Sequence, residues 1–251
     1  MTNLQHPGLE TISRSIHPAC EMYKYIRTVE TQEQRAIELY FQTTEFTVGS
    51  LLRFFAEEQV DPAEKTILDF ASGYGRFTRY FVKLFREVTV SDVEQGMLDF
   101  CRNEFDVQSF RSLAKDPSVI ERRSEKYDVV FCFSLFTHLN DRVWAGWFEK
   151  LFALVANRGY LVISTHGYKL FEKLNLVPPG SESRQPEFLF LKGNETDGRL
   201  DPSFYGNLVI KDEFVRRAIR QIKDIRIVKH CEMGEFDLYH DIYIFQKLAD
   251  K

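Results

Sequence analysis

The sequence predicts an α/β protein built around a doubly wound, mostly parallel sheet, and three observations support this. From about Lys65 onward, short apolar runs alternate with helical patterns, as they do in strand–helix–strand units. The run Tyr127–Ser134 is apolar at both odd and even positions, which is typical of a strand covered on both faces. The run Thr66–Phe70 leads directly into the glycine loop Gly73-Tyr74-Gly75, a tight turn between a strand and a helix.

Composition limits the class of protein. A chain of 251 residues with 44% hydrophobic content can bury one large core. A net charge of −4 provides no basic field for nucleic acid, and no apolar run approaches the length that spans a bilayer. The polar N-terminus lacks the apolar run of a signal peptide, and the 4 cysteines lie far apart, unlike a disulfide framework or a zinc site. We therefore expect a cytoplasmic protein with no metal, nucleic-acid partner or membrane association.

Seven strands are expected. A weak strand pattern lies near Val107–Phe110. The six clear patterns are Thr66–Phe70, Val88–Asp92, Tyr127–Ser134, Tyr160–Thr165, Ile225–His230 and His240–Gln246. The connection between the last two runs is too short for a helical crossover. We therefore expect these two strands to pair antiparallel, unlike the others.

The clearest helix covers Asp141–Val155, where aromatic and aliphatic residues recur at helical spacing and form an expected core stripe. Asp141 is the expected N-cap and Gly159 the expected stop.

Two segments lie outside the alternation of strands and helices. Residues 1–64 form an aromatic-rich helical extension or cap, with helices expected at Arg35–Phe41 and Phe46–Glu58. The remaining residues, 65–251, form the main domain. Within it, residues 167–210 form a long insertion after the fifth strand, and a segment of this kind is typically a lid over a substrate.

The glycine loop differs from two common phosphate-binding sequences. A dinucleotide fingerprint needs a third small residue where Thr78 stands, and the P-loop sequence does not occur. What remains is an acid, Asp69, at the end of one strand and a second acid, Asp92, at the end of the next. Asp92 would lie beside the loop, where a carboxylate can accept both hydroxyls of a ribose. Arg76 is expected to begin the following helix and to stay solvated.

Ile67–Phe77 together with Val88–Leu98 resembles motifs I and II of class I S-adenosylmethionine-dependent methyltransferases. Tyr127–Leu139 is similar to that family's fourth strand and the turn after it, and Ala156–Ile163 to its turn into strand five. The antiparallel last strand is another family feature. The resemblance covers residues 65–167 well and 211–247 loosely. It implies a Rossmann-like seven-stranded sheet, a methyltransferase domain at 65–251 and S-adenosylmethionine as the cofactor.

The resemblance also implies which residues bind the cofactor. Asp69 and the backbone from Ala71 through Gly73 to Gly75 would surround the methionine part. Asp92 would hold the ribose, and Val93 and Met97 would lie near the adenine edge. The tip of strand four would lie against cofactor and substrate, through Phe133, Ser134 and Leu135. The sequence departs from the family pattern in two places: Ala71 stands where glycine is usual, and no acid follows the third strand to take the adenine amino group.

Methyl transfer from a sulfonium is an in-line displacement, so alignment of the acceptor supplies much of the acceleration. A hydroxyl acceptor also benefits from a base, and histidine suits neutral pH. His138 follows strand four, His166 follows strand five, and His240 begins the final strand, all at the edge where ligands bind. We expect His166 to be the catalytic base and His138 to be the next candidate. A supporting or surface role is the alternative for each.

The acceptor is expected to be a small molecule or a sugar or glycan precursor, methylated at oxygen. Ser134-Leu135-Phe136-Thr137 stands where related enzymes that methylate nitrogen carry Asn/Asp-Pro-Pro-Tyr/Phe, and no Pro-Cys occurs there either. Two alternatives stay open on the same architecture. One is an NAD(P)-dependent oxidoreductase, against which Thr78 counts, and the other is a non-catalytic binding module.

Overall fold

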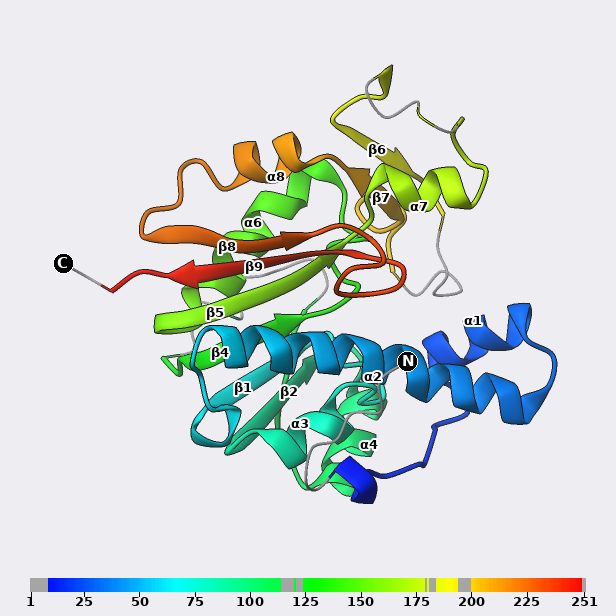
Figure 1. Ribbon diagram of the computed structural model, residues 1–251, viewed down its shortest axis with the longest axis vertical. Coiled ribbons are helices and arrows are strands. Elements are labelled where there is room, and N and C mark those ends of the chain that lie inside the picture. The colour runs from blue at the N-terminus through cyan, green and yellow to red at the C-terminus, as the bar shows by residue number, and fades with distance from the viewer. Residues whose placement is uncertain are drawn as a thin grey trace. The chain divides into compact units, whose positions relative to one another are not determined.

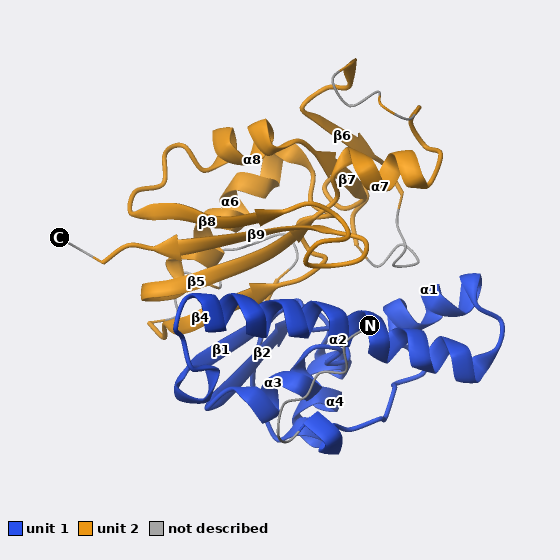
Figure 2. Ribbon diagram, in the orientation of Figure 1, with its two compact units in different colours: residues 1–111 blue, residues 112–251 orange. Residues whose placement is uncertain are grey.

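The computed structural model describes residues 9–113, 120, 124–178, 180, 184–193 and 200–249. The chain divides into two compact units, residues 1–111 and 112–251 (Figure 2). Its strands form a seven-stranded sheet in the order β3-β2-β1-β4-β5-β9-β8 and a two-stranded sheet of β6 and β7 (Figure 1). The order 3-2-1-4-5 is that of Rossmann-like sheets, which confirms the predicted fold class.

The first unit contains three parallel strands. They are β1 (Thr66–Phe70), β2 (Glu87–Asp92) and β3 (Gln108–Arg111), and β2 pairs with both others. The helices α3 (Thr78–Leu84) and α4 (Gln95–Phe105) pack on β2. Two 3-10 turns, Leu9–Thr11 and Pro62–Glu64, complete this unit together with α1 and α2.

The N-terminal helices differ in detail from those expected. The two predicted segments are one continuous helix, α2 (Glu33–Glu57), and a separate helix, α1 (Glu21–Val29), precedes it. The polar residues at the expected break do not interrupt α2, because their hydroxyls bond to carbonyls of the preceding turn. Thr43 donates to Leu39 O at 2.8 Å and Thr44 donates to Tyr40 O at 2.7 Å.

The described residues of the second unit contain the remaining strands and the helices α6, α7 and α8. The parallel strands are β4 (Tyr127–Cys132) and β5 (Val155–Thr165), and β9 (Asp241–Lys247) pairs antiparallel with both β5 and β8 (Ile225–Cys231). The predicted antiparallel end of the sheet is therefore confirmed. The helices are α6 (Asp141–Ala153), α7 (Tyr168–Lys173) and α8 (Asp212–Ala218).

The aromatic stripe of α6 forms the core of this unit, as expected. Trp144 stacks on Phe148 at 5.4 Å, and Phe148 meets Phe245 of β9 edge-on at 4.8 Å. The predicted N-cap is wrong by one residue: Asn140 caps the helix, accepting from the N–H groups of Arg142 and Val143. The Asn140 side chain lies over the first turn that follows it, whereas Asp141 is already the first residue of the helix.

Gly159 is not the stop of α6. The helix ends at Ala153, and Gly159 lies inside β5, where the pairing with β4 slips between Tyr127 and Val129. A Cβ atom at Gly159 would lie 2.6 Å from the backbone oxygen of Asp128 and 2.9 Å from that of Ala156. Glycine is needed here for the close approach of two backbones.

The insertion 167–210 has secondary structure of its own. It contains α7 and the antiparallel pair β6 (Phe188–Leu191) and β7 (Asn207–Ile210), which gather at one end of the second unit in Figure 1. Residues 179, 181–183 and 194–199 of the predicted lid lie outside the described residues. Within the part of the chain that the structure describes, no helix has the length and apolar character needed to cross a membrane.

Two glycine-to-alanine substitutions should change stability in opposite directions. Gly159→Ala should lower the free energy of unfolding by about 1–3 kcal/mol, because its methyl group meets fixed backbone oxygens. Gly146→Ala, inside α6 with nothing within 4 Å of its added Cβ, should raise it by about 0.5–1 kcal/mol. Urea unfolding measures both values, and a Gly159→Ala variant as stable as the parent protein would contradict the close approach.

Candidate functional site

The loop between β1 and α3 passes through three residues with left-handed backbone. Ala71, Gly73 and Gly75 have φ of 59°, 55° and 68°. The loop is fixed at both ends, since Ser72 N–H donates to Ser91 O of β2 at 3.1 Å and Gly75 N–H donates to Ser72 O at 3.0 Å. A Cβ at Gly75 would collide with the Phe105 ring, so both backbone conformation and packing require glycine there.

Asp92 holds the loop from the end of β2. Its side chain is 7% exposed, and one carboxylate oxygen accepts from Gly73 N–H at 2.9 Å while the other accepts from Glu94 N–H at 3.1 Å. Burial raises the pKa of Asp92, and the backbone N–H bonds oppose that change. The N–H of Val93 is a third backbone donor to this carboxylate, and a carboxylate, which offers about four lone-pair sites, can accept one further donor such as a ribose hydroxyl.

Asp69, at the end of β1, is 2% exposed and accepts a hydrogen bond of 2.6 Å from the Thr78 hydroxyl. Burial raises its pKa to about 7; the Thr78 bond lowers it and the charge of Asp92 raises it further. Thr78, which breaks the dinucleotide pattern, therefore ties the first turn of α3 to the strand.

The other predicted cofactor residues of the first unit follow directly after β2. Val93 is the first residue beyond the strand, and its carbonyl accepts from Arg111 Nε at 2.9 Å. Met97 lies buried in the first turn of α4, and on the same helix the Cys101 thiol approaches Gly73 O at 3.5 Å. The fold thus gathers all seven cofactor residues predicted in this unit around the loop, the end of β2 and the start of α4.

Sequence reasoning missed a contribution from the N-terminal segment to this loop. The His17 ring stacks on Tyr74 of the loop, with centroids 4.0 Å apart and planes 4° from parallel. Arg79 of α3 is 1% exposed and donates through one nitrogen to Ser13 O and Ser15 O, both at 2.9 Å.

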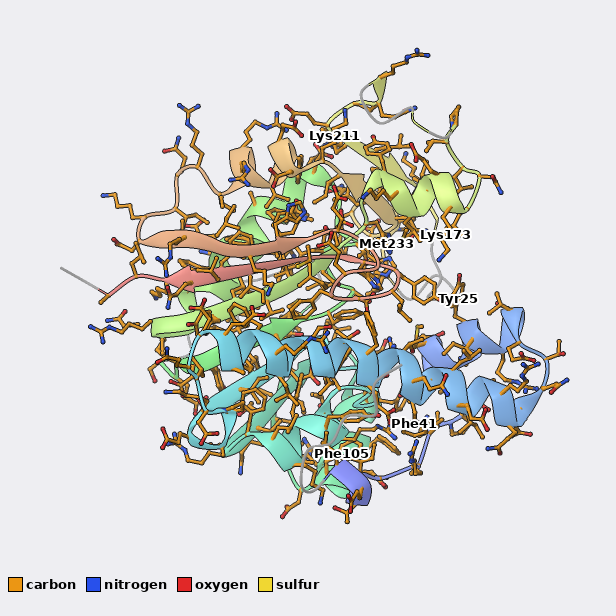
Figure 3. The ribbon with its side chains drawn as sticks, in the orientation of Figure 1. Tyr25, Phe41, Phe105, Lys173, Lys211 and Met233 are labelled. Carbon is orange, nitrogen blue, oxygen red and sulfur yellow. The ribbon has the colours of Figure 1, made fainter. Side chains whose placement is uncertain are left out.

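The Arg79 guanidinium lies 5.4 Å from the centroid of the Phe41 ring and 5.5 Å from that of Phe105, both labelled in Figure 3. Its Nε also donates to Gly75 O at 3.2 Å. One buried cation therefore connects the N-terminal segment to the glycine loop.

Arg76 does not stay solvated as expected. Its Nε donates to the Thr44 hydroxyl at 2.7 Å and its terminal nitrogen to the Thr43 hydroxyl at 2.8 Å, both on α2. The helix after the loop begins at Thr78. The local sequence gave no indication of this, because the partners come from a helix far earlier in the chain.

The second unit contains the other three predicted cofactor residues, beyond the carboxyl end of β4. Phe133 is buried, and Leu135 O accepts from His138 N–H at 2.9 Å. Ser134 adopts a left-handed backbone with φ of 62°, and its N–H donates to the Ser164 hydroxyl of β5 at 2.7 Å. Non-glycine residues in this conformation are concentrated at functional sites.

The pairing of β5 with β9 brings two histidines together. Thr165 pairs with Asp241, so His166 and His240 are one residue beyond the paired ends; their rings stack at 5.1 Å. His138, the other predicted catalytic residue, lies 6.4 Å from His166 between ring centroids and stacks on Tyr205 at 4.9 Å. Burial lowers the pKa of His166 well below its ordinary value, and the neighbouring His240 and His138 lower it further.

An acid that sequence reasoning missed lies beside His240. Asp237, 2% exposed, places Oδ1 2.7 Å from His240 Nδ1, and the same oxygen accepts from the N–H groups of Tyr239 and His240. On the other side of the ring, His240 Nε2 lies 3.4 Å from the Ser134 hydroxyl. Asp237 lies in the irregular connection between β8 and β9, where no periodic pattern marks it.

Part of the chain matches a known family. Residues 67–159, from β1 into β5, match the family model described as a methyltransferase domain. The sequence has no significant match among curated proteins.

Solved structures with similar folds cover nearly the whole chain. They include a magnesium protoporphyrin IX methyltransferase from Synechocystis PCC 6803 with bound SAH, with 14% identity, a TM-score of 0.58 and coverage of 90% of this chain and 93% of that one. An S-adenosylmethionine-dependent methyltransferase from Clostridium acetobutylicum ATCC 824 is 15% identical, with a TM-score of 0.58. The match covers 91% of this chain and 99% of that one. A DhpI–SAH complex is 14% identical, with a TM-score of 0.55, and the match covers 92% of this chain and 97% of that one. The chain therefore has the methyltransferase fold.

Ala71→Gly should stabilise the protein by about 1 kcal/mol, because glycine adopts the observed φ of 59° without the strain of a Cβ atom. Ala63→Gly is the matched control, at an exposed position of the 3-10 turn Pro62–Glu64, and should destabilise by about 0.5–1 kcal/mol. Urea unfolding gives both values. A loss of stability in Ala71→Gly equal to that of the control would contradict a strained loop.

Asp69 should make stability depend on pH. The folded protein keeps a proton on this carboxyl up to a pKa of about 7, whereas the unfolded chain releases it near the ordinary value of 3.8. The free energy of unfolding should therefore fall as pH rises from about 3.8 to about 7. The fall, measured relative to Asp69→Asn, should reach up to about 1.4 kcal/mol per pH unit. Urea unfolding of both proteins from pH 4.5 to 8 tests this, and parallel stability curves would contradict the raised pKa.

Proposed function

We propose that this protein is an S-adenosylmethionine-dependent methyltransferase that methylates a hydroxyl of a small molecule or of a sugar or glycan precursor. The observation that carries the proposal is the bond of 2.9 Å from Gly73 N–H to the Asp92 carboxylate. It sets an acid for the ribose directly against a loop whose left-handed backbone, with small residues at 71, 73 and 75, allows a ligand to come close.

The residues of the loop fit the cofactor. A Cβ built on Gly73 finds no atom within 4 Å, so the protein leaves space on that side of the loop. Asp69 and the backbone from Ala71 to Gly75 would hold the methionine part, Asp92 the ribose, and Val93 with Met97 the adenine edge. When bound, S-adenosylmethionine supplies a methyl group on a sulfonium, whose thioether is a good leaving group. Similar folds solved with bound SAH support this choice.

The N-terminal segment supports a closed cofactor site. Arg79 joins the carbonyls of Ser13 and Ser15 to Gly75 O, and His17 covers Tyr74 of the loop. We assign residues 1–64 to an extension that covers this loop and residues 65–251 to the methyltransferase domain.

The insertion 167–210 is our proposed lid for the acceptor. Backbone bonds tie it to both segments that carry a predicted catalytic histidine. Gly206 N–H donates to His138 O at 2.8 Å, and Ile210 N–H donates to His166 O at 2.9 Å. We propose that His138 and His166 face the acceptor there, as side chains beyond the carboxyl ends of parallel strands do. A similar fold that belongs to a magnesium protoporphyrin IX methyltransferase supports a small-molecule acceptor.

We also propose a cytoplasmic location with no nucleic-acid partner. The four cysteines, all among the described residues, are buried and form no disulfide, as is usual in a reducing compartment. The net charge of −4 offers no basic surface for a phosphate backbone.

Calorimetry with S-adenosylmethionine, S-adenosylhomocysteine and NADPH tests the cofactor. Binding of the first two without NADPH is the expected result. Binding of NADPH alone would indicate an oxidoreductase, and binding of none of the three would favour a non-catalytic module.

Asp92→Ala should weaken S-adenosylmethionine binding by about 1–3 kcal/mol, roughly 5- to 150-fold, through lost charge-assisted hydrogen bonds to the ribose. Asp99→Ala is the matched control, an acid on α4 that is paired with Arg102 and exposed, and its affinity should match that of the parent protein. Titration calorimetry on both folded variants measures the change. Unchanged affinity in Asp92→Ala would refute the ribose assignment.

A further inference from the structure

His240, which is not one of the two histidines predicted to be catalytic, has a polar side chain next to each of its ring nitrogens. Asp237 lies on one side of its ring and Ser134 on the other. The β5–β9 register fixes the position of the ring, since it places Asp241 beside Thr165 and His240 beside His166. The Phe133 ring packs edge-on against the His240 ring, with the two ring centroids 4.7 Å apart.

The Asp237 carboxylate determines which nitrogen of His240 can accept a proton. An ionised carboxylate only accepts hydrogen bonds, so the contact of 2.7 Å requires a proton on His240 Nδ1. The lone pair of the neutral ring is then on Nε2, which faces the Ser134 hydroxyl. Two backbone N–H groups, those of Tyr239 and of His240 itself, hold Asp237 in place at 2.9 and 3.0 Å.

The Nδ1 atoms of the other two histidines have different surroundings. His138 Nδ1 lies 2.8 Å from Gly206 O, a neutral carbonyl. His166 Nδ1 is buried and has no hydrogen-bond partner among the described residues. A histidine that takes up a proton becomes a cation, and a buried cation needs an opposite charge close by. Asp237 provides that charge for His240.

We propose that His240, oriented by Asp237, is the base that accepts the proton of the acceptor hydroxyl. This rests on the proposed function. The acceptor oxygen forms its bond to the methyl carbon while the carbon–sulfur bond breaks and its electron pair stays on sulfur. The hydroxyl proton passes to His240 Nε2, and Asp237 stabilises the imidazolium that results. Asp237 is a positioning residue, because it acts through His240.

Ser134 marks the place of the acceptor hydroxyl. Its Oγ lies 3.4 Å from Nε2, a long and weak contact that a better placed hydroxyl can replace. The left-handed backbone of Ser134, φ 62°, presents that side chain at the end of β4.

The groups around His240 are compatible with a proton moving on and off its ring. Asp237 is the acid that faces it, and Ser134 and Phe133 are uncharged. His166, stacked on it from β5, stays neutral near pH 7 because burial holds its pKa well below the ordinary value. The next acid in sequence, Asp241, accepts instead from the backbone N–H of Met233, a residue labelled in Figure 3.

The first test needs no acceptor. Long-range nitrogen–proton NMR spectra of histidine-labelled protein at pH 8 should show the His240 ring with its proton on Nδ1, and Asp237→Ala should give a mixture of both tautomers. His230→Gln, a histidine stacked on Tyr243, identifies another signal and should leave the His240 pattern unchanged. A proton on Nε2 in the parent protein would overturn the assignment.

The second test uses radiolabelled S-adenosylmethionine with a panel of phenols and methyl glycosides as hydroxyl probes. His240→Gln should lower kcat by roughly 10²- to 10⁴-fold and leave S-adenosylmethionine affinity unchanged. His166→Gln and His138→Gln should lower kcat less, and His230→Gln should not lower it. The conservative Asp237→Asn variant should lower kcat by roughly tenfold or more without raising the KM of the cofactor.

Each outcome has a distinct meaning. If His166→Gln lowers kcat more than His240→Gln does, the assignment of His240 as the base is overturned while the proposed function stands. If no probe is methylated, the hydroxyl acceptor class is wrong, and with it this inference. Covalent labelling of Ser134 by a fluorophosphonate would show that the serine is itself a nucleophile, and this too would overturn the proposal.

Discussion

The bond between Gly73 N–H and the Asp92 carboxylate is the contact on which the loop region of the first unit depends. It joins the loop after β1 to the end of β2, so an acid and three left-handed residues keep one fixed arrangement. Burying a carboxylate is costly unless donors compensate, and here they are backbone N–H groups. Because one of those N–H groups, that of Gly73, is part of the loop itself, loop conformation and acid position stabilise each other.

A second buried charge ties the N-terminal extension to the same loop. Arg79 is compensated by carbonyls and aromatic rings, with Ser13, Ser15 and Gly75 as hydrogen-bond acceptors. Arg76 makes a similar link to the threonines of α2. The extension is therefore attached through polar contacts of the buried Arg79 and the partly exposed Arg76, so losing either arginine would affect both the extension and the loop.

The second unit carries its own chemical groups, gathered by strand register. The antiparallel pairing of β9 with β5 places the start of one strand beside the end of the other, which is why His240 and His166 stack although they lie far apart in sequence. The short connection before β9 then supplies Asp237, and the tip of β4 supplies Ser134. These residues come from three segments of irregular backbone at the same edge of the sheet: Ser134 follows β4, His166 follows β5, and Asp237 and His240 precede β9.

The sequence by itself determined the α/β class, the seven strands of the main sheet, the antiparallel end of that sheet and the acids of the glycine loop, because periodicity and the order of short-range turns carry that information. It also marked three histidines as candidates. Only the tertiary structure decided that Asn140 caps α6, that Gly159 lies in a bulge of β5 and that Arg76 is bound to α2. It also decided that the Asp237 carboxylate lies 2.7 Å from the His240 ring. These outcomes depend on which backbone atoms and side chains approach one another across long stretches of chain, and no local pattern records such contacts.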